Sequence, residues 1–249
     1  MRLASLVPAK IKRIRRALRR ARATLTSPPI RRETDSFNIL DVAAFAAAMD
    51  SASYYQEHML TARSFESDFD LMAFAAQLAS KNGLVIEVGV ASGRTINHLA
   101  GLLPDRSVYG FDSFEGLPED WRTGLHAGKF RGDLPETKPN VKLIKGTFAE
   151  TLPAFAQRQD EPVALLHVDC VLYTSTATVL RALGKRMTSG TVIVFDEYWN
   201  YPGWRHHEFR AFQEFVAERG ISYSYKAFVP KHQQVCVVIN SPAGAPARQ

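Results

Sequence analysis

Five apolar, β-prone segments alternate with segments of helix length along the middle of this chain, and this alternation limits the folds open to it. The five segments are residues 84–88, 108–111, 141–144, 163–168 and 191–195. Strands that alternate with helices form βαβ units, in which a parallel sheet carries helices on both faces. The pattern therefore predicts a doubly wound α/β fold.

Two further apolar segments, 222–229 and 234–239, complete the expected sheet. The four residues between them are too few for the helix that a parallel crossover requires. We therefore expect an antiparallel hairpin at the sheet edge, within a mostly parallel sheet of seven strands. Helical additions are predicted before the first strand, at 37–49, 54–61 and around 71–78.

Basic residues are concentrated at one end of the chain. Residues 1–32 hold eleven of the 31 lysines and arginines and no acid, so 20 basic residues remain against 25 acidic ones, a charge of −5. The whole-chain charge of +6 therefore gives no reason to expect a nucleic-acid partner. We predict a basic leader and linker over 1–35, one domain over 36–240 and a disordered tail over 241–249.

The leader has several interpretations. Ile11, Ile14 and Leu18 recur at helical spacing among arginines, which predicts a short amphipathic basic helix. Residues 1–25 would then make peripheral contact with an anionic membrane. The alternatives are a solvated arm, a helix packed on a neighbouring subunit of a homo-oligomer, and a mitochondrial transit peptide.

Composition favours an ordinary globular protein. With 46% hydrophobic and 22% charged residues, the chain is neither disordered nor a multispanning membrane protein. No apolar run reaches the roughly 18 residues of a membrane span. Two cysteines exclude a disulfide scaffold and a cysteine-built zinc site, so we expect a cytoplasmic location.

A glycine-containing turn follows the first strand. Gly89 and Gly93 permit a tight strand-to-helix turn, and the N–H groups of the next helix can receive an anion. The Gly-x-x-x-Gly spacing differs from that of dinucleotide folds and of phosphate-binding P-loops, which disfavours an NAD-dependent enzyme. Asp112 ends the second strand about twenty residues later, where an acid can accept hydrogen bonds from ribose hydroxyls.

Longer strings extend this pattern to a known family. The chain resembles the class I S-adenosylmethionine-dependent methyltransferases and, more narrowly, the macrocin O-methyltransferase (TylF-like) family, which methylates sugar hydroxyls of natural products. The resemblance covers about residues 54–239. It is carried by Glu87-Val88-Gly89-Val90-Ala91-Ser92-Gly93, Gly110-Phe111-Asp112-Ser113-Phe114-Glu115-Gly116-Leu117-Pro118, Thr151-Leu152-Pro153, His167-Val168-Asp169-Cys170, Val194-Phe195-Asp196-Glu197-Tyr198 and Pro202-Gly203-Trp204…His207-Glu208.

The resemblance implies a cofactor site for S-adenosylmethionine. Asp112 would bind the ribose with support from Ser113, and Phe148 would border the adenine unless it belongs to the core. The methionine part of the cofactor would contact Glu87, Gly89, Ser92 and Gly93.

Three carboxylates, those of Asp169, Asp196 and Glu197, follow the fourth and fifth strands. In an open parallel sheet these strand ends open on one crevice, and carboxylate oxygens suit Mg²⁺. Together with the resemblance, they predict a metal-assisted O-methyltransferase in which Asp169 binds the metal and acts as the base. The alternative is salt-bridged or helix-capping carboxylates. The expected acceptor is a hydroxyl of a small molecule or glycan.

One position departs from the family pattern. The family usually reads Asp-x-Asp-Leu-Tyr, whereas Val171 stands at the second acid here. If that acid is the true base, either the protein is an impaired methyltransferase fold that binds without catalysis, or another group such as His207 replaces it. His207 could equally be a surface histidine, His167 is expected in the core, and a metal-free methyltransferase is a further alternative.

The segment between Phe114 and Asn140 is long and rich in glycine, proline and charge. Loops of this length without regular structure are usually binding loops or lids. Because it follows the second strand, we predict that it closes over the cofactor crevice and orders when ligand binds.

Overall fold

The computed structural model describes residues 35–241. These residues fall into two units, and the boundary lies between Ala46 and Ala47, inside helix α2 (Ile39–His58). Most of the predicted leader and tail lies outside the described residues, as do the membrane-contact and transit-peptide interpretations of the leader. Within 35–241, no helix is both long and apolar enough to cross a membrane.

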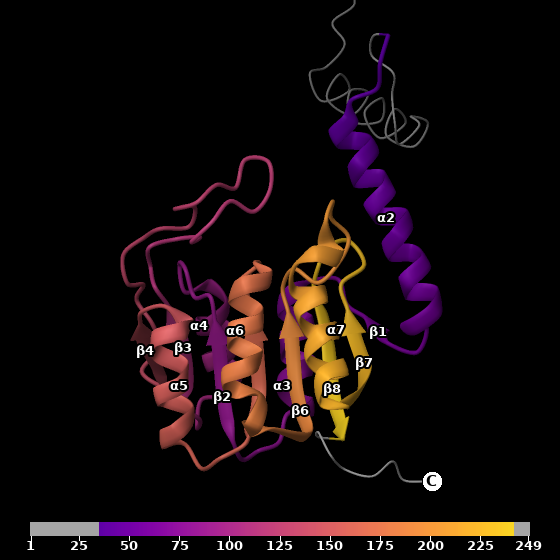
Figure 1. Cartoon of the computed structure of the whole chain (residues 1–249). Coiled ribbons are helices and arrows are strands. Elements are labelled where there is room, and N and C mark those ends of the chain that lie inside the picture. The colour runs from indigo at the N-terminus through magenta and orange to yellow at the C-terminus, as the bar shows by residue number, and fades with distance from the viewer. Residues whose placement is uncertain (1–34, 242–249) are drawn as a thin grey trace, which may run out of the picture. The chain divides into compact units, whose positions relative to one another are not determined.

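The second unit contains one eight-stranded sheet (Figure 1). Its strand order is β1-β7-β8-β6-β5-β2-β3-β4, and β8 is antiparallel to both of its neighbours while the other pairs are parallel. The predicted doubly wound α/β fold is therefore confirmed. The strands are β1 (Arg63–Ser64), β2 (Leu84–Val88), β3 (Val108–Asp112), β4 (Val141–Lys145), β5 (Val163–Val168), β6 (Met187–Phe195), β7 (Ser222–Phe228) and β8 (Val235–Ser241).

Two details differ from the sequence prediction. The hairpin does not end the sheet, because the short strand β1 pairs in parallel with β7 beyond it. Two residues are too few to give a periodic pattern, so the sequence carried no signal for β1. The helices predicted at 37–49 and 54–61 are one continuous helix, α2, in which the Ser51 hydroxyl donates back to the Ala47 carbonyl one turn earlier.

Helices cover both faces of the sheet. Helices α5, α6 and α7 lie on one face, and α3 and α4 lie on the other (Figure 1). Two of them begin at clear caps: Ser67 accepts from the Asp70 N–H at the start of α3, and Thr147 and Glu150 form a reciprocal capping box at α5. Their bounds are α3 (Asp68–Leu78), α4 (Arg94–Leu102), α5 (Phe148–Arg158), α6 (Tyr173–Leu183) and α7 (Glu208–Arg219).

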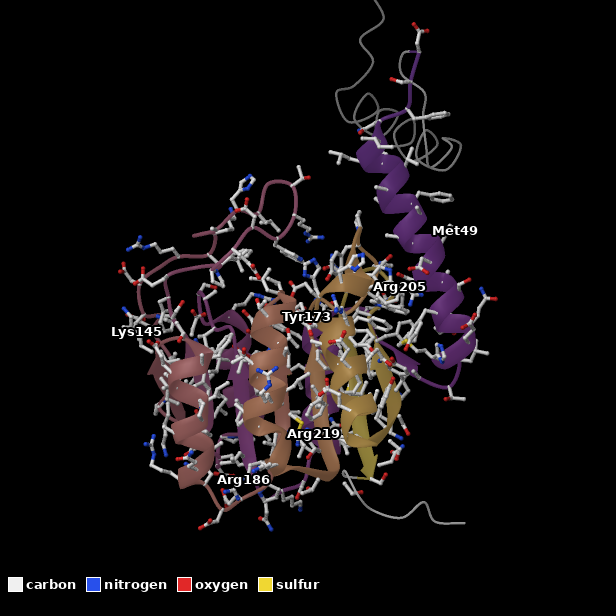
Figure 2. The ribbon with its side chains drawn as sticks, viewed as in Figure 1. Met49, Lys145, Tyr173, Arg186, Arg205 and Arg219 are labelled. Atoms are coloured by element: carbon white, nitrogen blue, oxygen red, sulfur yellow. The ribbon has the colours of Figure 1, made fainter. Side chains whose placement is uncertain are left out.

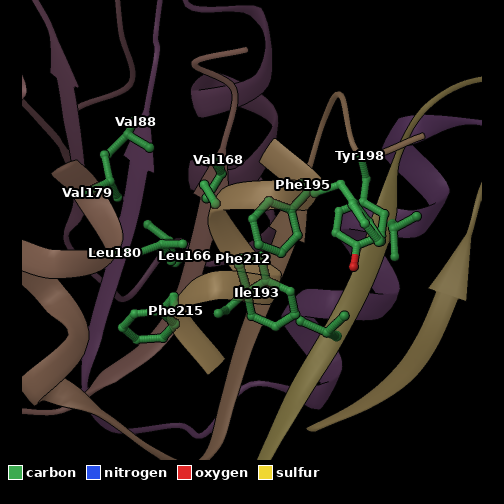
Figure 3. Packing of buried hydrophobic residues seen from close by; sticks show 14 of the residues in the cluster. Val88, Leu166, Val168, Val179, Leu180, Ile193, Phe195, Tyr198, Phe212 and Phe215 are labelled. Carbon is green, nitrogen blue, oxygen red and sulfur yellow. The ribbon is translucent and has the colours of Figure 1, made fainter. Parts of the chain in front are cut away.

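The core has a layer on each side of the sheet, because successive side chains of a strand point to opposite faces. Leu166 and Ile193 pack with Leu180 of α6 and Phe212 of α7 in the first layer (Figure 3). On the other face, the side chains that pack together include Val85, Leu165, Val192, Leu71, Ile96 and Leu99. This alternation also decides the face to which each polar strand residue is directed.

The carboxyl ends of the parallel strands gather at one edge of the sheet. Figure 2 places Tyr173, the first residue of α6, toward this edge, and Arg186 and Arg219 toward the opposite one. The loop between β3 and β4, residues 113–140, extends beyond the carboxyl ends (Figure 1). The strand ends and this loop provide the walls of the site described next.

Candidate active site

A cavity of about 690 Å³ opens at the carboxyl ends of the strands. This volume lies within the range typical of small-molecule sites. Its walls come from the turns after β2, β4, β5 and β6, from the start of α6 and from the 113–140 loop that follows β3. Seven residues singled out from the sequence line it: Gly89, Ser92, Asp112, Ser113, Phe148, Asp169 and Glu197.

Four other predicted site residues do not line this cavity: Glu87, Gly93, Asp196 and His207. Gly93 is the N-cap of α4. Glu87 is completely buried, where one carboxylate oxygen accepts from the Thr95 hydroxyl at 3.0 Å and the other lies 2.9 Å from His167 Nδ1. Its role at the methionine end of the cofactor therefore stays a prediction.

Gly89 brings two strand ends close together. Its φ of +89° is unfavourable for other residues, and a Cβ atom there would overlap the backbone carbonyl of Asp169. The Asp169 N–H donates to the Val88 carbonyl at 2.9 Å, and the Gly89 N–H donates to Phe111 at 2.9 Å. The glycine thus allows the ends of β2, β3 and β5 to meet at the cavity.

Asp112 holds the glycine turn through its carboxylate. Oδ2 accepts from the N–H groups of Val90 and Ala91, both at 2.8 Å, and Oδ1 accepts from the Phe114 N–H at 2.7 Å. A carboxylate has about four acceptor positions, so these three bonds leave capacity for a ligand hydroxyl. The predicted contact with a ribose is compatible with this geometry and stays a prediction.

Asp169 and Asp196 lie together with His167. One potential metal-ligand atom of each residue lies within 4.8 Å of those of the other two. Among the described residues, Glu197 is not part of this group. Burial, reinforced by the Asp196 charge, raises the pKa of Asp169 well above its ordinary value. Burial also acts to raise the pKa of Asp196, but the charge of nearby His167 holds it below the usual value.

His167 differs from the simple core residue that the sequence predicted. Its side chain is buried as expected, but burial is outweighed by Asp196 and Glu87, which raise the pKa of His167 well above the ordinary value. Because β2 and β5 pair with Glu87 opposite His167, the two side chains share one face of the sheet. The sequence shows a glutamate and a histidine in these two strands, but it does not show the register between β2 and β5 that brings them together.

Glu208, the first residue of α7, ties the ends of β5 and β6 together. Its Oε1 accepts from the N–H groups of Val171 at 3.1 Å and Cys170 at 3.4 Å, and its Oε2 accepts from the Glu197 N–H at 3.1 Å. Burial and the nearby Asp196 raise the pKa of Glu208 to about 8. The sequence showed Glu208 only as part of a motif and gave it no role.

Val171 lines the cavity in a strained backbone conformation. Its φ is +51°, in the left-handed region that β-branched residues rarely adopt, and its side chain is only 4% exposed. Its N–H is one of the three held by Glu208. The position at which the family usually carries an acid therefore presents an apolar side chain to the cavity.

His207 lies among aromatic rings and not at the cavity wall. It is half-buried between Trp121 and Tyr201, with ring-centroid separations of 6.2 and 6.4 Å, and burial lowers its pKa. Its buried Nδ1 has no hydrogen-bond partner among the described residues. The guanidinium of Arg122 packs over the Tyr201 ring at 4.9 Å, and the Trp121 ring lies 5.6 Å from that of Tyr201, so this part of the 113–140 loop is held against the aromatic group.

The same loop contributes directly to the cavity. Glu115, Leu117, Pro118 and Phe130 line it. Closure of this loop over the crevice stays a prediction, as does its ordering on ligand binding.

Comparison with known proteins agrees with this architecture. The methyltransferase-domain family matches residues 86–198. A curated relative from Streptomyces olivaceus, 8-demethyl-8-(2,3-dimethoxy-alpha-L-rhamnosyl)-tetracenomycin-C 4'-O-methyltransferase, is 27% identical over 141 residues. The match covers 47% of this chain and 53% of that protein, so the chain spans about half the length of this relative.

Two solved structures share the fold. The calicheamicin methyltransferase CalS11 has a TM-score of 0.54 at 20% identity, with 95% of this chain and 94% of that chain covered. The O-methyltransferase NovP has a TM-score of 0.52 at 19% identity, with 82% and 98% covered. The chain therefore shares its fold with these two structures, and residues 86–198 match a methyltransferase domain.

The overlap at Gly89 predicts a large cost for Gly89→Ala. Gly190 is the matched control, because its φ is also +89° but no atom lies within 4 Å of an added Cβ. Gly190→Ala should lower the free energy of unfolding by about 1–2 kcal/mol through backbone strain alone. Gly89→Ala should cost at least about 2 kcal/mol more, because the Asp169 backbone must move. Urea denaturation measures both, and equal losses would contradict the overlap.

The Glu208 contacts predict a second stability difference. Glu208→Ala removes the acceptor of three backbone N–H groups and should lower the free energy of unfolding by about 2 kcal/mol or more. Glu218→Ala, at an exposed position of the same helix, should change it by less than about 0.5 kcal/mol. Chemical denaturation at neutral pH compares the two variants. Similar values would mean that Glu208 does not hold the strand ends.

Proposed function

We propose that this protein is an S-adenosylmethionine-dependent O-methyltransferase that acts on a hydroxyl of a sugar or a glycosylated natural product. The observation that carries the proposal is the cavity itself, in which Gly89 and Asp112 line the wall together with Asp169. The nature of the acceptor is supported by the resemblance to the macrocin O-methyltransferase family and by the curated relative, whose name specifies a rhamnosyl acceptor.

The residues of the cavity suit a direct methyl transfer. S-adenosylmethionine supplies a methyl group on a positively charged sulfur. The acceptor oxygen attacks the methyl carbon, the carbon–sulfur bond breaks with its electron pair going to sulfur, and the hydroxyl proton passes to Asp169. Burial makes Asp169 a stronger base than an exposed carboxylate, because it raises the pKa of that carboxyl. The surrounding walls would hold the methyl donor and the acceptor hydroxyl in line.

The acidic group also fits a divalent ion. Asp169 and Asp196 present carboxylate oxygens, and His167 Nε2 and Glu197 Oε2 are buried atoms without a hydrogen-bond partner among the described residues. Asp169 and Asp196 would hold the ion, predicted from the sequence as Mg²⁺, and the proposed third ligand Glu197 lies outside their group. A bound ion would lower the pKa of the acceptor hydroxyl.

Binding and turnover test the proposal separately. Purified protein should bind S-adenosylmethionine saturably in calorimetry and not NAD. It should then transfer a methyl group from radiolabelled cofactor to a member of a panel of α-L-rhamnosides. No cofactor binding by the folded protein would reject the proposal.

Replacement of the proposed base provides a sharper test. Asp169→Asn should keep cofactor affinity while turnover falls by about 10²–10⁴-fold, because the proton acceptor is lost. Asp160→Asn is the control, since Asp160 is exposed at the end of α5. Unchanged turnover in Asp169→Asn would exclude Asp169 as the base.

Val171 supports one alternative function, a methyltransferase fold that binds cofactor without catalysing transfer. On that alternative the wild-type protein binds S-adenosylmethionine but methylates no acceptor, and Val171→Asp restores transfer by returning a carboxylate to the cavity wall. If wild-type protein turns over, the alternative fails. Turnover that persists in EDTA identifies the metal-free enzyme.

A further inference from the structure

The imidazole of His167 is the buried polar group whose surroundings are least explained by packing. His167 lies inside β5, between Glu87 of β2 and Val194 of β6 in the register of the sheet. Its side chain is 1% exposed. A histidine at such a position must satisfy both ring nitrogens within the protein, because a buried polar atom without a partner costs free energy.

One ring nitrogen is satisfied, and its partner fixes the tautomer. His167 Nδ1 lies 2.9 Å from Oε2 of Glu87. Oε1 of the same carboxylate accepts from the Thr95 hydroxyl at 3.0 Å, so Glu87 is itself held in place. An ionised carboxylate only accepts hydrogen bonds, and Nδ1 must therefore carry a proton. In the neutral ring, the lone pair is then at Nε2.

The other nitrogen lies near two carboxylates and bonds to neither. Nε2 has no hydrogen-bond partner among the described residues, and Asp196 Oδ1 lies 3.8 Å from it. One oxygen of Asp169 completes a group in which all three atoms are within 4.8 Å of one another. Two ligands that each lie roughly 2.1 Å from a shared ion are about 3–4.2 Å apart, so the Nε2–Oδ1 separation suits a common ion.

We propose that Nε2 of His167 is a ligand of a divalent transition-metal ion, which it shares with the carboxylates of Asp169 and Asp196. This inference rests on the metal site of the proposed function and changes its ligands: an imidazole nitrogen takes part, and the preferred ion is no longer Mg²⁺. Imidazole suits transition ions, whereas Mg²⁺ strongly prefers oxygen. The Glu87 contact is the outer hydrogen bond that metal-bound histidines usually make.

The proposal also gives Val171 a physical context. With valine at position 171, the site has one carboxylate oxygen fewer than the family pattern provides. The imidazole nitrogen of His167, which is grouped with Asp169 and Asp196, would be a neutral ligand in the same site. Such a site should discriminate between ions more strongly than a site made only of carboxylates. We therefore expect Mn²⁺ and Co²⁺ to bind at least about tenfold more tightly than Mg²⁺.

The direct test uses the intact protein with Mn²⁺ alone. Calorimetry measures the affinities for Mn²⁺ and Mg²⁺, and pulsed electron paramagnetic resonance of the Mn²⁺-bound protein detects nuclei that are bonded to the ion. The expected result is a nitrogen coupling whose splitting changes when the histidines are labelled with ¹⁵N. This measurement needs neither turnover nor a variant, so it does not depend on a substitution at His167 being tolerated.

Matched variants then assign the nitrogen. His167→Gln should remove the nitrogen coupling and raise the Mn²⁺ dissociation constant by about tenfold or more. His232→Gln should do neither, because its side chain is exposed and the contact of His232 with Asn200 uses the backbone carbonyl. Asp169→Asn should also weaken Mn²⁺ binding. Circular dichroism and cofactor titration check that each variant is folded.

Three outcomes would overturn the inference. Saturable Mn²⁺ binding without nitrogen coupling would mean an all-oxygen site, and nitrogen coupling that persists in His167→Gln would assign the ligand elsewhere. Absence of saturable binding would mean that the imidazole forms an ion pair with Asp196 in a metal-free protein. If the protein still binds the cofactor and transfers methyl groups in EDTA, the proposed function stands although the metal-ligand proposal fails. If the nitrogen coupling is observed but the protein does not bind the cofactor, the proposed function fails and the metal-ligand proposal stands.

Discussion

The pairing of β2 with β5 is the interaction on which the rest of the site depends. It places the end of the first core strand, with its glycine turn, directly against the end of the strand that carries Asp169. The absence of a side chain at Gly89 makes this approach sterically allowed. The same register sets Glu87 opposite His167. The backbone hydrogen bonds between β2 and β5 therefore determine both the position of the cavity wall and the pairing of Glu87 with His167.

Two carboxylates at this edge of the sheet are stabilised by hydrogen bonds from backbone N–H groups. Asp112 receives three such bonds from the glycine turn and the loop that follows β3, and Glu208 receives three from the ends of β5 and β6. A buried carboxyl group is costly unless its oxygens have hydrogen-bond partners of this kind. By contrast, His167 Nε2 and Glu197 Oε2 are two of the seven buried side-chain atoms that have no hydrogen-bond partner among the described residues.

The order of strands and helices could be predicted from the sequence because apolar periodicity is a local property. Strand ends were equally predictable, and so Gly89, Asp112 and Asp169 were correctly expected at one edge of the sheet. The pairing of Glu87 with His167 could not be predicted, since it depends on the register between strands about eighty residues apart. Glu208 was missed for a similar reason: its contacts arise only when α7 packs across the ends of β5 and β6.

The contacts of Glu208 also define where the protein tolerates change. Because one carboxylate at the start of α7 holds two strand ends, a shift of this helix would also move the cavity wall. The inward face of α7, which includes Phe212 and Phe215, is therefore part of the alignment of the site. Ala217 and Glu218, in the last turn of the helix, are exposed on its outer side. Sequence divergence and engineered surface charge can accumulate there, while the buried face of the same helix must keep its shape.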